Sequence, residues 1–248
     1  MQSNDQMAYD RGSTIFSPDG RLYQVEYARE AVKRGSVTIG VKTSESVVLL
    51  AEKRINSPLL VSESIEKLYG VDEHISVAAS GHVADARRLV DLARVETQRD
   101  RYMYDEAMDA RTLAKQIGDQ IQEFTQYGGT RPFGCALLVA GVTENDVQLI
   151  ETEPSGAIIE YKAASIGKGR NEVEEILEER YEEEMSTEDG IRLAVKALKE
   201  SDADTEIDKV EAMVVDTDGT RKLSDDDLRP YIEEVNDTQV SDDESEEE

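Results

Sequence analysis

Short apolar runs that come in pairs, each pair joined by a brief polar turn, constrain the fold of this chain more than any other feature. Such runs occur at residues 37–41, 47–51, 67–71 and 75–79. Their length, their β-branched residues and the polar turns between them predict antiparallel hairpins. Residues 83–101 and 112–127 come next, and their apolar side chains recur at helical spacing, which predicts two amphipathic helices.

The second half of the chain repeats this order of strands followed by helices. Its expected strands are residues 136–142, 147–150, 157–161 and 210–215, and its expected helices are residues 172–181, 188–199 and 225–235. Ser186 and Ser224 stand where the N-caps of the last two helices are expected. Runs of strands and helices in this order indicate α+β layers rather than a parallel sheet. We therefore predict a four-layer αββα sandwich, in which helix pairs cover two sheets packed face to face.

No linker divides the pattern, so the sequence predicts one domain over residues 1–235. Within it, residues 13–35 hold a turn and an extra N-terminal helix, and residues 36–235 form the sandwich. Residues 236–248 are strongly acidic and are expected to be a disordered tail.

Acidic residues dominate the charge, with 55 Asp and Glu against 28 Lys and Arg and a net charge of −27. This surface argues against nucleic acids and anionic membranes as partners, because binding them depends on basic residues that neutralise phosphates. The tail accounts for only part of the excess, since residues 172–184 and 202–208 are acidic as well. Salt shortens the Debye length to about 3 Å at 1 M and weakens self-repulsion. The composition therefore favours a halophilic source.

Neither a membrane anchor nor a metal site is expected. No apolar run approaches the roughly 20 residues of a membrane-spanning helix, and no secretory signal is visible. We therefore expect a cytoplasmic protein. The single cysteine, Cys135, excludes an intrachain disulfide and a cysteine-rich metal site, and no metal or cofactor is expected.

An ordered leader precedes the first predicted strand. The turn at residues 17–20 combines Pro18, which presets φ, with Gly20, which tolerates positive φ. A helix is expected from residue 21 to residue 34, because its apolar residues recur at helical spacing.

A hydroxyl residue, Ser36, follows Gly35 at the start of the first strand. Enzymes that use an N-terminal Ser or Thr expose it by cleaving off a leader, and the freed α-amine, with a pKa near 8, then acts as base. One candidate function is therefore an autoprocessed N-terminal-nucleophile hydrolase that uses Ser36. That enzyme would have to discard the whole leader.

The leader also carries a distinctive signature. Tyr9, Asp10 and Arg11, followed by residues 16–28, resemble the signature of archaeal, in particular haloarchaeal, 20S proteasome α-subunits almost residue by residue. The resemblance continues through residues 64–67, 80–86 and 126–134, and it covers residues 6–235.

The resemblance implies a sandwich of the N-terminal-nucleophile class and outer seven-membered rings of α-subunits stacked on rings of β-subunits. Such α-subunits keep their leader and have no catalytic residues, because the threonine-protease activity lies in the β-subunits. They gate the entry of unfolded protein substrates into the proteolytic chamber. They also dock a proteasome-activating AAA ATPase.

Specific residues carry these roles by position. The resemblance implies a gate segment at residues 1–12, with gate residues Tyr9, Asp10, Arg11, Pro18 and Tyr27. It implies a pocket for the C-terminus of an activator, formed by Lys67, Glu26, Gly81, Gly20 and Arg21. It implies a pore constriction at Tyr127, Gly128 and Gly129.

Simpler interpretations stay open for several of these residues. Lys67 can be a plain surface lysine, and Tyr127 with the two following glycines can simply end a helix. A third class of function is a soluble acidic binding protein unrelated to degradation.

Overall fold

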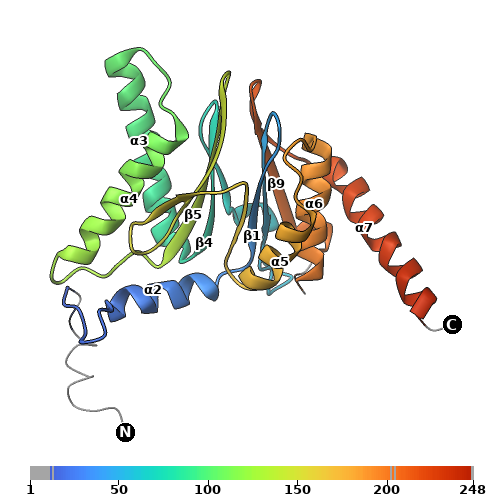
Figure 1. The fold of residues 1–248 in the computed structure, drawn as a ribbon, viewed down its shortest axis with the longest axis horizontal. Coiled ribbons are helices and arrows are strands. Elements are labelled where there is room, and N and C mark those ends of the chain that lie inside the picture. The colour runs from blue at the N-terminus through green and yellow to red at the C-terminus, as the bar shows by residue number, and fades with distance from the viewer. Residues whose placement is uncertain (1–11, 13, 202, 204, 247–248) are drawn as a thin grey trace, which may run out of the picture.

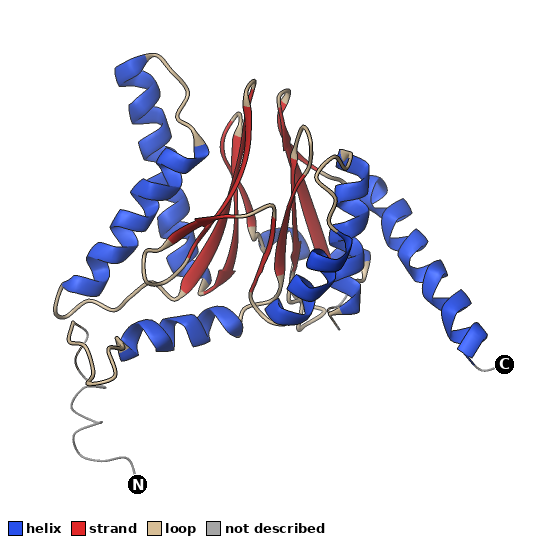
Figure 2. Ribbon diagram, viewed as in Figure 1, coloured by secondary structure: helices blue, strands red, loops and turns tan. Residues whose placement is uncertain are grey.

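The computed structural model describes residue 12 and residues 14–201, 203 and 205–246. Within these residues, two antiparallel five-stranded sheets pack face to face, and helices cover the outer face of each sheet (Figure 1). Figure 2 shows the two strand layers between the two helix layers. The predicted α+β four-layer sandwich is thereby confirmed.

The first sheet has the strand order β10-β9-β2-β1-β8. Its strands are β1 (Thr38–Lys42), β2 (Val47–Glu52), β8 (Ala163–Ile166), β9 (Val210–Asp216) and β10 (Gly219–Lys222). The second sheet has the order β3-β4-β5-β6-β7. Its strands are β3 (Leu68–Asp72), β4 (Ile75–Gly81), β5 (Cys135–Thr143), β6 (Asp146–Thr152) and β7 (Ile158–Glu160).

Three apolar cores separate the four layers. Along β2, Val48 and Leu50 pack in the core shared with α5 (Arg170–Arg180), α6 (Thr187–Glu200) and α7 (Asp225–Glu246). Their neighbours Val47 and Leu49 pack in the core between the two sheets. Successive side chains of a strand point to opposite faces, so a strand buried on both faces is apolar throughout. This double burial explains the unbroken apolar runs in the sequence.

The other helix pair covers the second sheet. Helices α3 (Val83–Tyr104) and α4 (Ala110–Gln126) pack on β3, β4 and β5 through the third core, which includes Leu89, Leu113 and Leu137. Each such side chain contributes about 1.5–3 kcal/mol when it is fully buried. Cys135 lies in this core, as predicted, and burial raises the pKa of its thiol to about 12.

Both predicted N-caps are confirmed. Ser186 Oγ accepts the N–H of Asp189 at 3.2 Å at the start of α6. Ser224 Oγ accepts the N–H of Asp227 at 3.3 Å, and the Asp227 carboxylate accepts the N–H of Ser224 at 2.9 Å. This reciprocal arrangement satisfies backbone donors that a helix start otherwise leaves unpaired.

The extra N-terminal helix, α2 (Tyr23–Lys33), lies across the ends of the strands (Figure 1). Its buried face consists of Val25, Ala28 and Val32, and it contacts β4 and β5. On its other side the Arg29 guanidinium donates to both carboxylate oxygens of Glu153, at 2.8 and 3.1 Å. An apolar face and a bidentate ion pair therefore hold the leader helix on the sandwich.

Two strands, β8 and β10, were not predicted. β8 has only four residues and directly follows β7, because the chain crosses from one sheet to the other at residues 161–162. β10 consists of Gly219, Thr220, Arg221 and Lys222 at the edge of its sheet. Polar edge strands lack the alternating apolar pattern that marks a strand in a sequence.

The C-terminal helix α7 continues to Glu246, whereas the sequence predicted disorder from residue 236. Beyond the body of the molecule it projects outward as a single helix (Figure 1). Within the described part of the chain, no helix is both long and apolar enough to cross a bilayer.

Candidate functional site

A pocket of about 530 Å³ opens where the end of α2, the start of β1, the end of β4 and the start of α3 meet. It is lined by Lys67 and Gly81, two of the residues predicted for activator binding. Its further polar lining includes Arg34, Ser36, Arg54, Glu66, Ser80, His82 and Arg87, and its apolar lining includes Ala31, Ile65, Val83 and Ala86. The pocket therefore combines an excess of cationic groups with an apolar wall.

Lys67 extends inward from the segment before β3. Its Nζ donates to Ser36 O at 2.8 Å, to Ser36 Oγ at 2.9 Å and to Val37 O at 3.2 Å. Burial lowers the pKa of Lys67 to about 7, although the charges of Glu211 and Glu52 oppose the shift. Lys67 is therefore not a plain surface lysine.

Glu211 of β9 holds the backbone of Lys67 in place. Its Oε1 accepts the backbone N–H of Lys67 at 2.6 Å, and its Oε2 accepts Lys222 Nζ at 3.0 Å. Glu211 is buried, and a buried carboxylate is tolerated when charged and hydrogen-bonded partners compensate its lost solvation.

Gly81 lines the pocket at the end of β4. Its φ is +107°, and a Cβ there would lie 2.3 Å from Gly134 O, so no other residue fits without a shift of the backbone. Ala79 N–H donates to Lys67 O at 2.9 Å. Because N–H groups alternate along a strand, the N–H of Gly81 points to the same side, beyond the start of β3, where the pocket lies.

A second carboxylate, Asp85 of α3, fastens the segment that follows the predicted pore constriction. It accepts Arg131 NH2 at 2.7 Å and Gly134 N–H at 2.9 Å. Burial alone would raise the pKa of Asp85, but these hydrogen bonds outweigh it and hold the pKa below its ordinary value. Phe133 packs on Phe124 of α4 with ring centroids 4.8 Å apart, so both ends of this segment are anchored.

The constriction residues stand at the exposed end of α4. Tyr127 is the C-cap of α4 and is 58% exposed, and Thr130 Oγ1 donates to its carbonyl at 2.8 Å. Gly129 adopts a φ of +87°, which turns the chain after the helix. Tyr127 therefore ends a helix and is exposed, and its assignment to a pore constriction stays a prediction.

Three residues predicted for the pocket lie elsewhere in this chain. Gly20 and Arg21 precede α2, and Glu26 is in its first turn, where its carboxylate accepts Arg29 NH1 at 2.7 Å. The pocket is at the opposite end of α2, where Ala31 and Arg34 line it, and the rise from Glu26 to Arg34 is roughly 12 Å. A single chain therefore brings Lys67 and Gly81 together in the pocket. It does not bring Gly20, Arg21 and Glu26 to the same place.

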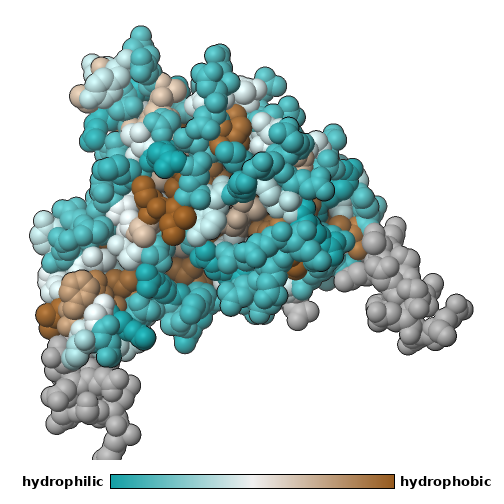
Figure 3. Space-filling model, in the orientation of Figure 1, coloured by the Kyte–Doolittle hydropathy of each residue, from teal (hydrophilic) through white to brown (hydrophobic). Residues whose placement is uncertain are grey.

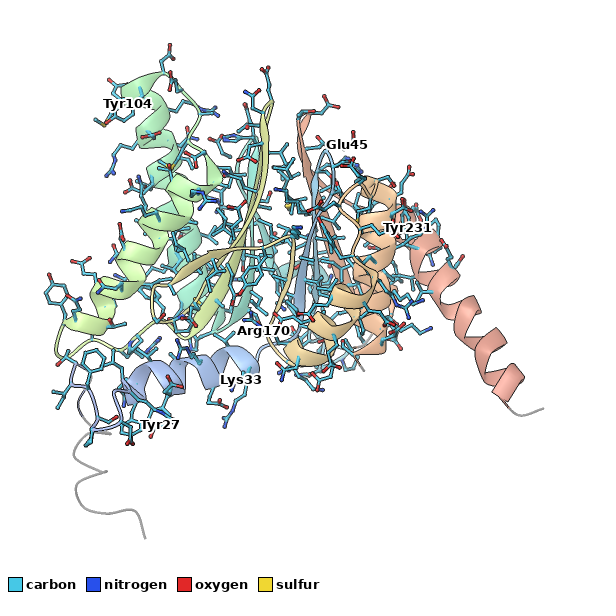
Figure 4. The ribbon with its side chains drawn as sticks, in the orientation of Figure 1. Tyr27, Lys33, Glu45, Tyr104, Arg170 and Tyr231 are labelled. Carbon is cyan, nitrogen blue, oxygen red and sulfur yellow. The ribbon has the colours of Figure 1, made fainter. Side chains whose placement is uncertain are left out.

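Two of the five residues predicted for the gate, Pro18 and Tyr27, are among the described residues. Tyr9, Asp10 and Arg11 lie outside the described residues. Pro18 is exposed in a turn that is closed by hydrogen bonds between Ser17 and Arg21, of which Ser17 N–H to Arg21 O is 2.9 Å. Tyr27 is half exposed at the outer end of α2 (Figure 4).

Exposed apolar side chains gather near this turn. Ile15 is 52% exposed and Phe16 is 65% exposed. Figure 3 shows a largely hydrophilic face with apolar groups collected beside the segment that enters α2.

Sequence reasoning missed the other cations of the pocket. Arg34, Arg54 and Arg87 come from a helix end, a loop and another helix, and only the fold gathers them. It also missed the role of Asp85 and Arg131. Both residues lie in segments that carry the resemblance, yet 46 positions separate them and no local pattern links them.

Residues 32–215 match the family model of the proteasome subunit, and residues 9–31 match the model of the N-terminal signature of A-type proteasome subunits. The chain belongs to the proteasome subunit family. It is 53% identical over 237 residues to the proteasome alpha subunit of Halobacterium salinarum, covering 94% of each chain.

Further relatives extend across the archaea. Identity is 50% to the proteasome alpha 2 subunit of Haloarcula marismortui, over 94% of this chain and 97% of the relative. It is 51% to the proteasome alpha subunit of Archaeoglobus fulgidus, over 93% of this chain and 95% of the relative. The resemblance inferred from the leader is confirmed, and this proteasome subunit is of the α type.

We expect Asp85→Asn to lower the free energy of unfolding by about 1–3 kcal/mol at pH 7, because Gly134 N–H and Arg131 lose a charged acceptor. The pKa of Asp85 is depressed in the fold. Its contribution is therefore present above the unfolded pKa of about 3.9 and is lost as the pH falls through the folded value. Urea unfolding at several pH values, at constant salt, measures the difference.

The matched control is Asp119→Asn, which removes an exposed partner of Lys115 on α4. We expect a loss near zero, since exposed pairs contribute little. A difference between the native chain and Asp85→Asn that persists unchanged below pH 3 would contradict the role of the ionised carboxylate.

Proposed function

We propose that this proteasome subunit is a non-catalytic member of the 20S core particle. It forms the outer seven-membered rings with other α-subunits, stacks on β-subunits, gates the entry of unfolded protein substrates and docks a proteasome-activating AAA ATPase in the cytoplasm. The observation that carries the proposal is the cationic pocket at the inner end of the leader helix, which joins Lys67 to Gly81. The names of the relatives support the assignment to the α type.

The pocket has the chemistry needed to capture the end of a protein chain. A C-terminal carboxylate can accept from an ammonium group and a backbone N–H, and Lys67 and Gly81, which both line the pocket, can supply these. Ile65, Val83 and Ala86 offer an apolar wall for the preceding side chains of such a tail. We assign this pocket to the C-terminus of the activator.

A closed ring would bring the three separated residues, Gly20, Arg21 and Glu26, to the pocket of a neighbouring copy. In a head-to-tail ring, one surface of each copy meets a different surface of the next. Gly20, Arg21 and Glu26 are at the outer end of α2, where a neighbouring copy can reach them. We propose that each complete pocket combines Lys67 and Gly81 of one copy with Gly20, Arg21 and Glu26 of the adjacent copy.

The gate is assigned to residues 1–12 and the turn that follows them. Ile15, Phe16 and Tyr27, which follow residues 1–12 in the sequence, present exposed apolar surface. Such surface can hold alternative positions of an aromatic segment, and a docking partner can then bias the equilibrium. Tyr127, Gly128 and Gly129 are assigned to the constriction beneath the gate.

Removing residues 1–12 is expected to speed hydrolysis of short peptides by the assembled particle severalfold, because the pore loses its cover. Fluorogenic peptide assays on particles rebuilt with β-subunits measure the rate. The matched control removes residues 236–248 at the other end and should leave the rate unchanged.

Unchanged peptide rates after removal of residues 1–12 would contradict the gate. The alternative hydrolase, which would use a freed Ser36, is tested by the intact mass of the purified chain. We expect a mass that includes residues 1–35, whereas a species starting at Ser36 would favour the alternative.

Lys67→Ala is expected to weaken docking of the activating ATPase while rings still assemble. Loss of a charged hydrogen bond costs about 1.5–3 kcal/mol, which corresponds to a roughly ten- to hundredfold rise in Kd. Surface plasmon resonance with the assembled particle measures the affinity. Lys115→Ala, on the exposed side of α4, is the control, and an equal effect of both changes would remove the assignment.

The net charge of −27 supports adaptation to high salt, as does the presence of haloarchaeal relatives. Salt shortens the Debye length and screens the repulsion between acidic side chains. We therefore expect the thermal unfolding midpoint to rise as KCl is raised from about 0.1 M to about 2 M. Replacing the exposed Glu172, Glu175 and Glu178 of α5 by glutamine should reduce the slope. A midpoint that does not respond to KCl would contradict the proposal.

A further inference from the structure

A guanidinium in the middle of α2 joins two carboxylates that belong to different elements. Arg29 NH1 donates to Oε1 of Glu26 at 2.7 Å, three residues earlier on the same helix. Its NH2 and Nε donate to the two carboxylate oxygens of Glu153 at 2.8 and 3.1 Å. Arg29 therefore connects a carboxylate of the leader helix to a carboxylate of the sandwich.

Glu153 lies in the turn between β6 and β7, and this turn is held firmly. Ser155 Oγ donates to the Glu153 carboxylate, and the N–H of Gly156 donates to Glu153 O at 2.9 Å. Gly156 has a φ of +86°, and a Cβ there would lie 2.7 Å from Gly118 O of α4. The turn thus packs closely on α4, and it offers Arg29 a carboxylate of fixed position.

A second ion pair on the same helix serves as a comparison. Lys33 Nζ binds Glu30 Oε1 at 2.7 Å, with the same spacing along the helix as Arg29 and Glu26. Lys33 points away from the sandwich (Figure 4), and the two side chains are 67% and 55% exposed. Exposed pairs of this kind contribute little and leave both side chains free to reorient. The planar guanidinium of Arg29 is instead fixed by its bidentate contact with Glu153.

We propose that Arg29 is a positioning residue for docking, because it fixes the carboxylate of Glu26 for the chain end that enters the pocket of the adjacent copy. This inference rests on the proposed docking function. Arg29 binds Oε1 of Glu26, and the other oxygen, Oε2, accepts from an N–H or O–H group of the docking chain. A carboxylate that is ordered before docking loses little side-chain freedom on binding. The effect of Arg29 on docking therefore depends on Glu26.

A double-mutant cycle on assembled particles tests this dependence. The probe is the proteasome-activating ATPase, and surface plasmon resonance at constant KCl measures its Kd for Arg29→Met, for Glu26→Gln and for both changes together. We expect Arg29→Met to raise Kd roughly two- to tenfold in the native chain, through the loss of pre-organisation. In the chain that carries Glu26→Gln, the same change should raise Kd by less than about twofold. A role confined to stability would give the same ratio in both backgrounds.

Further variants separate position from charge. Arg29→Lys keeps a positive charge beside Glu26 but loses the bidentate contact with Glu153, so we expect it to raise Kd as Arg29→Met does. Glu153→Gln weakens the anchor with Arg29 in place and should also raise Kd, and it replaces Arg29→Met if that variant does not form rings. The matched control is the cycle of Lys33→Met and Glu30→Gln, which should leave Kd unchanged.

Two kinds of outcome would overturn the inference in different ways. An equal effect of Arg29→Met in both backgrounds, or full recovery of the affinity in Arg29→Lys, would refute the positioning role and leave the docking function standing. Absence of ATPase binding to the native particle, or an unchanged affinity in Lys67→Ala, would refute the docking function and the positioning role with it.

Discussion

Close approach of backbones at the start of β1 is the constraint on which the rest of the structure depends. A Cβ at Gly35 would lie 2.3 Å from Ser80 Oγ, and a Cβ at Gly167 would lie 2.4 Å from Ser36 O. The absence of side chains lets three segments converge, and Ser80 Oγ then donates to Ser36 O at 2.9 Å. Lys67 Nζ binds the same carbonyl, so one oxygen ties the leader, both sheets and the pocket together.

At this junction the leader helix is joined directly to the pocket. Gly35 ends the leader and Ser36 starts the sandwich, and both residues line the pocket. An anion bound there would contact groups that anchor one end of α2, while the opposite end of α2 follows the turn at residues 17–20.

The sequence predicted the strands that are buried on both faces, because burial leaves an apolar pattern. It missed the contacts between residues that lie far apart in the chain. Val47 to Leu50 were recognisable as a strand because both faces of β2 are buried. β10 was not recognisable, because its polar residues face solvent at an edge. Lys67 was assigned from resemblance alone, since nothing in its local sequence indicates an amine bound to carbonyls 30 and 31 positions away. The arginines around it were invisible for the same reason: three separate elements supply them.

The same junction bears on the choice between a gate and an enzyme. A hydroxyl 2.9 Å from an amine of lowered pKa, as at Ser36 and Lys67, is an arrangement that nucleophilic catalysis uses. Yet Ser36 Oγ donates to Glu52 O at 2.6 Å, and the nitrogen of Ser36 is an amide as long as the leader is attached. Cleavage after Gly35 would create the base, but it would also detach α2 from the chain that positions it. A nucleophile and a tethered leader are therefore mutually exclusive uses of this pocket, and an α-type leader with its own buried face and ion pair favours the tethered one.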